Sequence, residues 1–134
     1  MINKINLLIN PKIKIIFFII LFIVIVLLID WLVIKPYIAE IYYFKGIVSN
    51  EKGSCIDAVS NFESAAQLDP YNGRILHASG TSYFNLIIYD KGENILQKTK
   101  KYIVDVNTYD NLGLLYSRLK KYLKAEEEFK KAFI

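Results

Sequence analysis

The chain has 134 residues, of which 54% are apolar, and a formal charge of +4, so it has room for about one domain of ordinary size. Residues 1–38 hold four lysines and one aspartate, net +3, which leaves only +1 for residues 39–134 and argues against a nucleic-acid-binding surface there. With one cysteine, Cys55, and one histidine, His77, the chain lacks the ligands for an internal disulfide or a structural zinc site.

The first predicted element is a membrane-spanning helix at Ile15–Ile34, which is apolar at every position except Asp30. At about 1.5 Å per residue it spans roughly 30 Å, the thickness of a bilayer's hydrocarbon core. Asp30 lies near the end of the run, where a charge costs less than at the centre. A cleavable signal peptide is the alternative, but its apolar core is usually about 7–15 residues long. The sequence therefore predicts a single-pass anchor in the lipid bilayer.

The lysines around this helix predict its orientation. Three lysines lie within residues 1–14 with no acidic residue among them, whereas Lys35 and Lys45 follow the helix together with Glu40. Since Lys and Arg are enriched on the cytoplasmic side, we expect residues 1–14 to form a basic cytoplasmic N-terminus. The rest of the chain then lies outside a bacterial cytoplasmic membrane. The asymmetry is small, and the opposite orientation stays open.

The remaining sequence repeats with a period of about 34 residues. Gly46, Gly80 and Gly113 are 34 and 33 residues apart. A small residue lies twelve positions after each glycine, and a large apolar residue lies sixteen positions after it. The positions expected to pack in this pattern are Gly46, Ala58, Phe62, Ala65, Pro70, Gly80, Tyr83, Leu112, Gly113, Tyr116, Ala125 and Phe129.

This pattern resembles the tetratricopeptide repeat (TPR), a helix–turn–helix unit of about 34 residues. The resemblance covers residues 39–134 and implies an all-α fold, in which the transmembrane helix is followed by an α-solenoid. The repeats are expected at about 39–72, 73–105 and 106–134, the last one incomplete. Small residues let the two helices of a repeat approach closely, and large residues fill the gaps around the contact. No repeat buries its apolar face alone, so neighbouring repeats must stack.

Turn signals predict the helix boundaries. Pro36 is expected to begin the first repeat helix, because its missing N–H costs nothing there. Ser54, with Asp57 three residues later, is expected to cap the second helix. Gly92 is expected to make the second repeat the loosest, since glycine in a helix costs about 1 kcal/mol relative to alanine. The six helices are expected at roughly 37–51, 55–68, 73–86, 90–103, 106–119 and 122–134.

No motif for catalysis or cofactor binding is present, since HExxH, CxxC, GxSxG, P-loop and GxGxxG patterns are all missing from the sequence. Glu126, Glu127 and Glu128 are expected to form a solvated helix face, because lysines follow four residues after the first two. Cys55 is expected at a packing position. The sequence therefore predicts no catalytic, cofactor-binding or metal-binding residue and no enzymatic activity.

In the TPR family the first helix of each repeat lines a concave groove, which binds an extended peptide or a helix of a partner protein. The resemblance implies such a groove here. Its expected residues are Glu40, Tyr43, Ile47, Asn50, Arg74, His77, Thr81, Phe84, Asn85, Asp110, Leu114 and Ser117. The resemblance thus implies a membrane-anchored scaffold or adaptor that binds another protein or peptide, with no cofactor and no nucleic acid.

Two alternatives stay open. One membrane helix followed by such repeats also resembles the C-terminal region of polysaccharide enzymes of the O-antigen ligase and polymerase type. Those enzymes place their catalytic residues in other membrane helices, so this chain would then be a fragment or an accessory tail. The second alternative is self-association through the last predicted helix, where Phe129, Ala132 and Phe133 have no capping helix after them.

Overall fold

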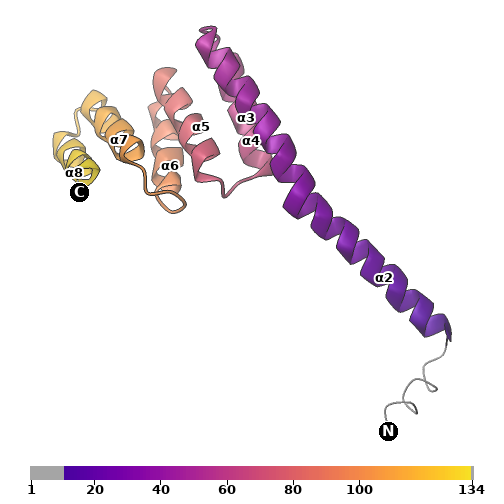
Figure 1. The fold of residues 1–134 in the computed structure, drawn as a ribbon. Helices are drawn as coiled ribbons and strands as arrows, with labels where there is room; N and C mark the ends of the chain where they lie inside the picture. Colours follow the sequence, from indigo (N-terminus) through magenta and orange to yellow (C-terminus); the bar gives the residue numbers. More distant parts are fainter. Residues whose placement is uncertain (1–10, 134) are drawn as a thin grey trace. The chain divides into compact units, whose positions relative to one another are not determined.

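The computed structural model describes residues 11–133 of the chain, and every regular element among them is a helix (Figure 1). The all-α prediction is therefore confirmed. Residues 1–10 of the predicted basic segment 1–14 lie outside the described residues. Ile134, which was expected in the last helix, also lies outside them. The chain divides into two compact units, Met1–Pro36 and Tyr37–Ile134, each taken by itself below.

Helix α2, Pro11–Ile29, is apolar along almost its whole length, and none of its residues is buried. It begins four residues before the predicted Ile15, at a proline whose missing N–H costs nothing in the first turn. The backbone stays helical from Pro11 to Glu51, and this is the one helix within residues 11–133 that is long and apolar enough to cross a membrane.

The prediction that Pro36 begins a new helix is wrong. A π-helical turn, η1 (Asp30–Ile34), leads directly into α3 (Lys35–Glu51), and the Lys35 N–H donates to the Asp30 carbonyl. In an α-helix the Pro36 ring would clash with the carbonyl of Leu32, four residues earlier. The wider π turn just before the proline relieves this conflict, so the helix continues instead of ending.

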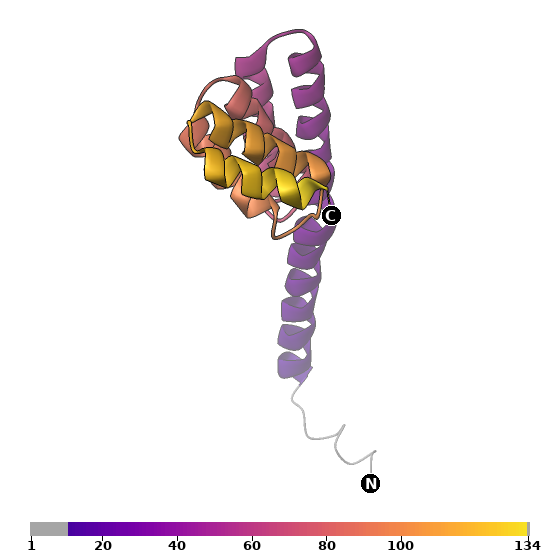
Figure 2. The ribbon, with the colours of Figure 1, turned by 90° about the vertical axis from the view of Figure 1, so that its left-hand side faces the viewer.

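The second unit consists of three helix pairs. They lie side by side in Figure 1 and one behind another in Figure 2. The pairs are α3 with α4 (Cys55–Leu68), α5 (Gly73–Asn85) with α6 (Tyr89–Thr99), and α7 (Val106–Arg118) with α8 (Tyr122–Ala132). Most predicted boundaries agree with these within one or two residues.

Helix α6 is the exception, because it ends at Thr99 instead of the predicted residue 103. The Tyr102 ring lies 5.6 Å from the Tyr71 ring, centroid to centroid, in the preceding connection. Ile103 packs so closely on Gly73 that a Cβ there would lie 2.7 Å from its side chain. Residues 100–105, which are not helical, thus pack against Tyr71 in the α4–α5 connection and against the first residue of α5.

The prediction that Ser54 caps α4 through its side chain is also wrong. Ser54 occupies the cap position, but its hydroxyl donates to the Asp57 carboxylate at 2.6 Å instead of accepting from the helix backbone. Its ψ of 76° departs from the extended backbone of a side-chain cap. Asn72 and Asp105 have extended backbones, and their side chains accept from Ile75 N and Asn107 N, respectively.

Glycines set the close approach of the two helices in the first and third pairs. A Cβ on Gly46 would lie 2.6 Å from the Phe62 ring, and one on Gly113 would lie 2.5 Å from the Phe129 ring. Both distances are far below van der Waals contact. The aromatic ring of the second helix therefore occupies the space that any other side chain on the first would need.

In the second pair, glycines lie on both helices. A Cβ on Gly80 would lie 2.8 Å from Leu96 Cγ, and one on Gly92 would lie 3.2 Å from Phe84 N and 3.3 Å from the Gly80 carbonyl oxygen. Gly92 thus lets the backbones of α5 and α6 approach more closely than alanine would. The expected loosening of this repeat took only helix propensity into account, and the structure adds a close contact that opposes it.

The apolar core lies between neighbouring pairs. One cluster joins Ala39 and Ala65 of the first pair to Ile75 of the second, and another joins Leu96 of the second pair to Leu112 of the third. Each cluster therefore includes residues of two neighbouring pairs, so the pairs share their core. Of the twelve positions expected to pack, all are buried except two that are half-buried, Pro70 and Phe129.

Two tyrosines make equivalent polar contacts between pairs. The Tyr83 hydroxyl on α5 donates to the Glu63 carboxylate on α4, and Gln97 Nε2 on α6 donates to the Tyr116 hydroxyl on α7 at 2.9 Å. Glu63 and Gln97 both lie 17 residues after the glycine of their own repeat. Burial, and then the hydrogen bond to Glu63, raise the pKa of Tyr83 to about 12, so the phenol stays a donor at neutral pH.

Candidate partner groove

A hollow of about 270 Å³ lies between the first and second helix pairs. Its lining comes from α3, α4 and α5 and consists of Ile47, Asn50, Glu51, Phe62, His77, Ala78, Thr81, Ser82 and Asn85. Five of these residues were predicted for the groove, namely Ile47, Asn50, His77, Thr81 and Asn85. Of the other four, Phe62 was expected only to pack, and the rest are sequence neighbours of predicted positions.

Helix α5 supplies one polar side of the hollow. His77, Thr81 and Asn85 are spaced four residues apart, so they lie one above another on the same helix face. The helix begins immediately after its Asn72 cap, which fixes where this face starts. On the other side, the close contact at Gly46 brings Phe62 of α4 against α3. The hollow is therefore polar along α5 and apolar where Phe62 reaches it.

His77 is held by side chains of α5 and α7. Its Nδ1 lies 2.9 Å from Thr108 Oγ1 and 3.8 Å from an Asp105 carboxylate oxygen, while its Nε2 lies 3.5 Å from Thr81 Oγ1. Asn111 Nδ2 in turn donates to Thr81 Oγ1 at 2.9 Å. Burial lowers the pKa of His77, and the Asp105 charge opposes that shift only in part. A neutral imidazole therefore faces the hollow at pH 7.

We expect the protein to lose stability between about pH 7.5 and 5.5 because of His77. The folded-state pKa is lowered, so the unfolded chain, with a His pKa of about 6.5, binds the proton more tightly. Protonation then favours unfolding as the pH falls below this value, and the full stability is present above it. Urea midpoints at the two pH values measure the loss, which a His77→Gln variant should largely lack. An equal loss in the variant would assign the pH dependence to another group.

Two predicted groove residues, Tyr43 and Arg74, are engaged elsewhere. Arg74 forms an ion pair with Glu40, and its guanidinium carbon lies 4.7 Å from the centroid of the Tyr43 ring. The Tyr43 ring also packs against Phe62 at 5.8 Å between centroids. These contacts link the first two pairs beside the hollow, and neither residue lines it.

Phe84 was predicted to lie in the same groove, and the structure places it in a different one. It is half-buried against the core cluster that contains Leu96, and its ring lies 5.9 Å from that of Tyr89. The chain reverses directly after α5, where Ile87 has a φ of 64°, and this turn brings Tyr89 beside the Phe84 ring. Phe84 therefore lines a second hollow of about 270 Å³, together with Asn85, Ile87, Tyr89 and Arg118.

The predicted groove residues of the third pair do not line the first hollow either. Asp110 is half-buried and Leu114 is exposed on α7. Ser117 lines a third hollow of about 320 Å³ on the outer side of the last pair, with Phe129 and Phe133. The structure thus brings together predicted residues of the first and second repeats and leaves those of the third apart.

The expectation that three glutamates form a solvated face is wrong for Glu128. Glu126 and Glu127 are exposed, and each accepts from the lysine four residues later, at 2.6 and 2.7 Å, which lowers the pKa of both carboxyls. Glu128 is buried and accepts two hydrogen bonds of 3.0 Å from Lys100 on the neighbouring pair. It lies three residues after buried Ala125, so the helical period returns it to the packed face.

The chemistry of the first hollow is that of amides, hydroxyls and one neutral imidazole beside an apolar side chain. Between Pro11 and Phe133, no group of three or more His, Cys, Asp and Glu side chains is placed to hold a metal ion. Cys55 is half-buried on α4 and carries a free thiol. Such a surface offers hydrogen bonds in both directions, which an extended polypeptide backbone can satisfy.

No known protein family matches the chain by sequence, and no curated protein matches it. Solved structures do match: the TPR domain of OM64 from Arabidopsis has a TM-score of 0.71 and 19% identity, covering 73% of this chain and 82% of that one. MamA has a TM-score of 0.68 and 24% identity over 71% of this chain and 56% of its own. The first TPR domain of human RPAP3 has a TM-score of 0.68 and 19% identity, covering 72% of this chain and 77% of that domain. At these identities the likeness is one of fold, and the fold of the helix pairs is that of TPR domains.

Proposed function

We propose that this chain is a scaffold that binds a polypeptide partner in the hollow between α3 and α5. The observation that carries the proposal is the meeting of Asn50, His77, Thr81 and Asn85 around one concave surface with Phe62 beside them. Amide and hydroxyl groups suit the backbone of an extended segment, and the apolar ring suits one of its side chains. The likeness to TPR domains supports a protein partner.

The proposal includes a membrane anchor at residues 15–34. Support comes from the apolar side chains of α2, which are exposed throughout and would otherwise face water at a large hydrophobic cost. A signal sequence can be equally long and apolar. Retention of the full-length chain in alkaline-washed membranes would distinguish an anchor from a cleaved signal sequence. Protease added outside spheroplasts should digest the repeats if residues 1–14 lie inside, as we propose.

The proposal assigns no catalytic step to the chain. The hydroxyl nearest to His77 is that of Thr108, which is fully buried and so out of reach of a substrate. A role as the tail of a larger polysaccharide enzyme would place the chemistry in other membrane helices. The mass of the native polypeptide tests this: a species much larger than 15.5 kDa containing this sequence would favour the tail.

Asn85→Arg and Asn50→Arg variants are expected to reduce partner binding by about tenfold or more. Both asparagines are exposed at the edge of the hollow, so the longer guanidinium side chain fills its space without entering the core. The measurement uses a photo-crosslinking residue at Thr81 in the full chain in its own membrane. The partner's yield is then compared between the variants by mass spectrometry.

Asn94→Arg provides the matched control, because Asn94 is exposed on α6 and does not line the hollow. It introduces the same charge and size and should leave the yield of the cross-linked partner unchanged. A yield that falls equally in all three variants, or in none of them, would contradict the assignment of the hollow as the binding site.

A further inference from the structure

One face of α3 is apolar and exposed. Its side chains are Tyr37, Ile41, Phe44 and Val48, which are 69, 41, 59 and 46% exposed, respectively. The opposite side of the helix packs against α4, where Gly46 meets Phe62. We call these four residues the α3 stripe. Single exposed apolar residues are ordinary on protein surfaces, whereas four along one helix face mark an interaction surface.

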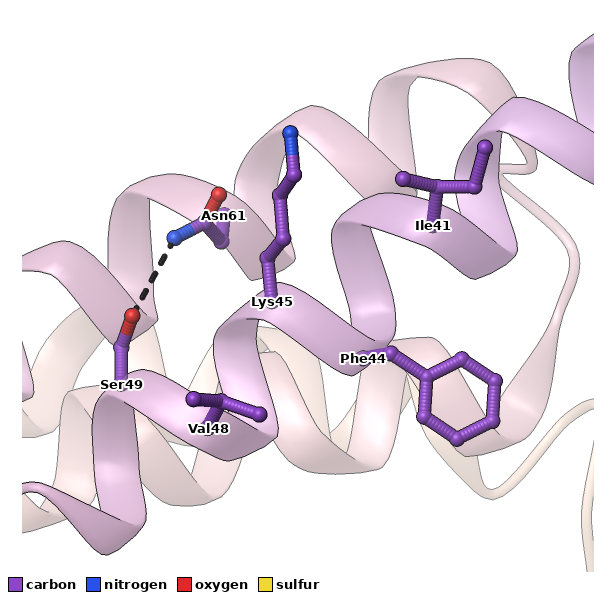
Figure 3. Close-up of a pocket in the computed structure, with 6 residues that line it drawn as sticks. All are labelled: Ile41, Phe44, Lys45, Val48, Ser49 and Asn61. Carbon is purple, nitrogen blue, oxygen red and sulfur yellow. Dashed lines mark hydrogen bonds between the residues drawn. The ribbon is translucent and has the colours of Figure 1, made fainter.

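The stripe borders a hollow of about 580 Å³. Figure 3 shows its lining, which consists of Ile41, Phe44, Lys45, Val48, Ser49 and Asn61. The dashed line in that view is the bond from Asn61 Nδ2 on α4 to Ser49 Oγ on α3, at 3.5 Å. An apolar strip with polar side chains along its edge is the usual anatomy of a protein–protein interface.

The spacing of the stripe indicates what covers it. From Tyr37 the intervals are four, three and four residues, which is the a/d spacing of a heptad repeat. The order of the intervals places the β-branched Ile41 and Val48 at a positions and the aromatic Tyr37 and Phe44 at d positions. β-branched residues are common at the a positions of parallel two-stranded coiled coils, so a second helix of the same kind fits this face.

The charge of Lys45, beside the stripe, disfavours an antiparallel pair, in which two copies of this lysine would face each other. Glu40 occupies a g position and Lys45 an e position, five residues later, and such pairs face each other across a parallel coiled coil. An antiparallel pair would place like charges opposite each other. Among residues 11–133, Lys45 has no carboxylate partner, and its Nζ lies 5.3 Å from the centroid of the Tyr42 ring. Glu40 pairs with Arg74 of the same chain through one carboxylate oxygen and its other oxygen is buried, so Glu40 is not free to accept from Lys45 of a second copy.

We propose that the α3 stripe pairs with the α3 stripe of a second copy of this chain, as a short parallel coiled coil. Two heptads are too short to associate strongly in water. The inference therefore rests on the membrane anchor of the proposed function, which confines two chains to one surface with the same end of each helix in the bilayer. This confinement raises the effective concentration of α3 and fixes the parallel direction.

Cysteine cross-linking of the full chain in its own membrane tests the pairing. In a Cys55→Ser background, Val48→Cys places a thiol at an a position, close to its equivalent in the second copy. Asn94→Cys places an exposed thiol on α6 as the control. Mild oxidation is expected to give at least about tenfold more disulfide-linked dimer from Val48→Cys than from Asn94→Cys. Equal yields, or a Val48→Cys chain linked mainly to another protein, would overturn the pairing.

A charge in the stripe supplies a second test. Phe44→Glu, added to Val48→Cys, should abolish the dimer, because two carboxylates would meet at one d position. Phe44 is more than half exposed, so the substitution should not unfold the chain. Co-expression with a Phe44→Lys, Val48→Cys chain should restore a cross-linked heterodimer, and failure to do so would overturn the proposal. Alkaline washing checks the anchor separately, and partner yield with Asn85→Arg checks the groove separately.

Discussion

The free energy of unfolding of a Gly80→Val chain is expected to be about 3 kcal/mol lower than that of the unchanged chain. A Cβ at this position would lie 2.8 Å from Leu96 Cγ and 3.2 Å from the Leu96 backbone nitrogen. Leu96 is fully buried in the core cluster between the second and third pairs, so it has no free space to move into. Urea unfolding of the full chain in detergent micelles, followed by circular dichroism, measures the loss.

The control for this experiment is Ser60→Val, at an exposed position of α4. It introduces the same side chain into a helix without a close contact and should change the free energy of unfolding by less than about 0.5 kcal/mol. Valine has a higher helix propensity than glycine, so propensity alone would stabilise Gly80→Val. A Gly80→Val chain as stable as the unchanged one would therefore contradict the close approach of α5 and α6.

Replacing Lys100 by methionine is expected to lower the free energy of unfolding by about 3 kcal/mol. The Lys100 ammonium donates to both carboxylate oxygens of Glu128 at 3.0 Å, and the two side chains are only 19 and 7% exposed. Without it, the buried carboxylate retains only Lys131, at 3.5 Å. The cost arises mainly from leaving a charge in a poorly solvated place, and the urea midpoint measures it.

A double variant separates this penalty from the loss of a contact. Lys100→Met with Glu128→Leu removes both charges and should recover most of the stability, because an apolar pair of similar volume replaces a buried ion pair at little net cost. Lys130→Met breaks the exposed pair with Glu126 and should leave the midpoint unchanged. An unchanged urea midpoint for Lys100→Met, as for Lys130→Met, would show that the buried ion pair contributes no more to stability than the exposed one.

The repeat fold could be predicted from the sequence because its requirements are local and periodic. Gly46, Gly80 and Gly113 recur where two helices of one pair must approach, and each meets a large side chain sixteen residues later. Helix α4 spans the predicted residues 55–68 because a glycine turn precedes it and a proline follows it. Such signals act within a few residues, so they can be found without knowledge of the neighbouring repeats.

The failures occur where a residue's surroundings come from another repeat. Glu128 has the local pattern of an exposed residue, and Lys100, 28 positions earlier, is its buried partner. The end of α6 was misplaced because Tyr102 packs against the α4–α5 connection and Ile103 against the first residue of α5. Pro36 was misplaced for a different reason, since a π turn let the helix accommodate it. None of these contacts leaves a periodic signal in the sequence.

The candidate groove could be predicted in part. His77, Thr81 and Asn85 share one helix face at intervals of four residues, so the repeat register was enough to group them. Two residues that hold His77 were missed, namely Asp105, the cap residue of α7, and Thr108 on α7. Asp105 lies just before the first residue of α7, and an aspartate in that place is a common helix cap, so this residue could have been found.

The tyrosine contacts between pairs differ from one repeat to the next. Tyr83 donates to Glu63, which lies 17 residues after the glycine of its repeat. Tyr116 donates to Glu93, which lies 13 residues after the glycine of its repeat, and accepts from Gln97 at position 17. If the second and third repeats were exchanged, Tyr83 would face Lys130 at the position of Glu63, and its acceptor would have to be Glu126, at the position of Glu93. The three units therefore share one shape but present different polar groups to the tyrosine of the unit that follows.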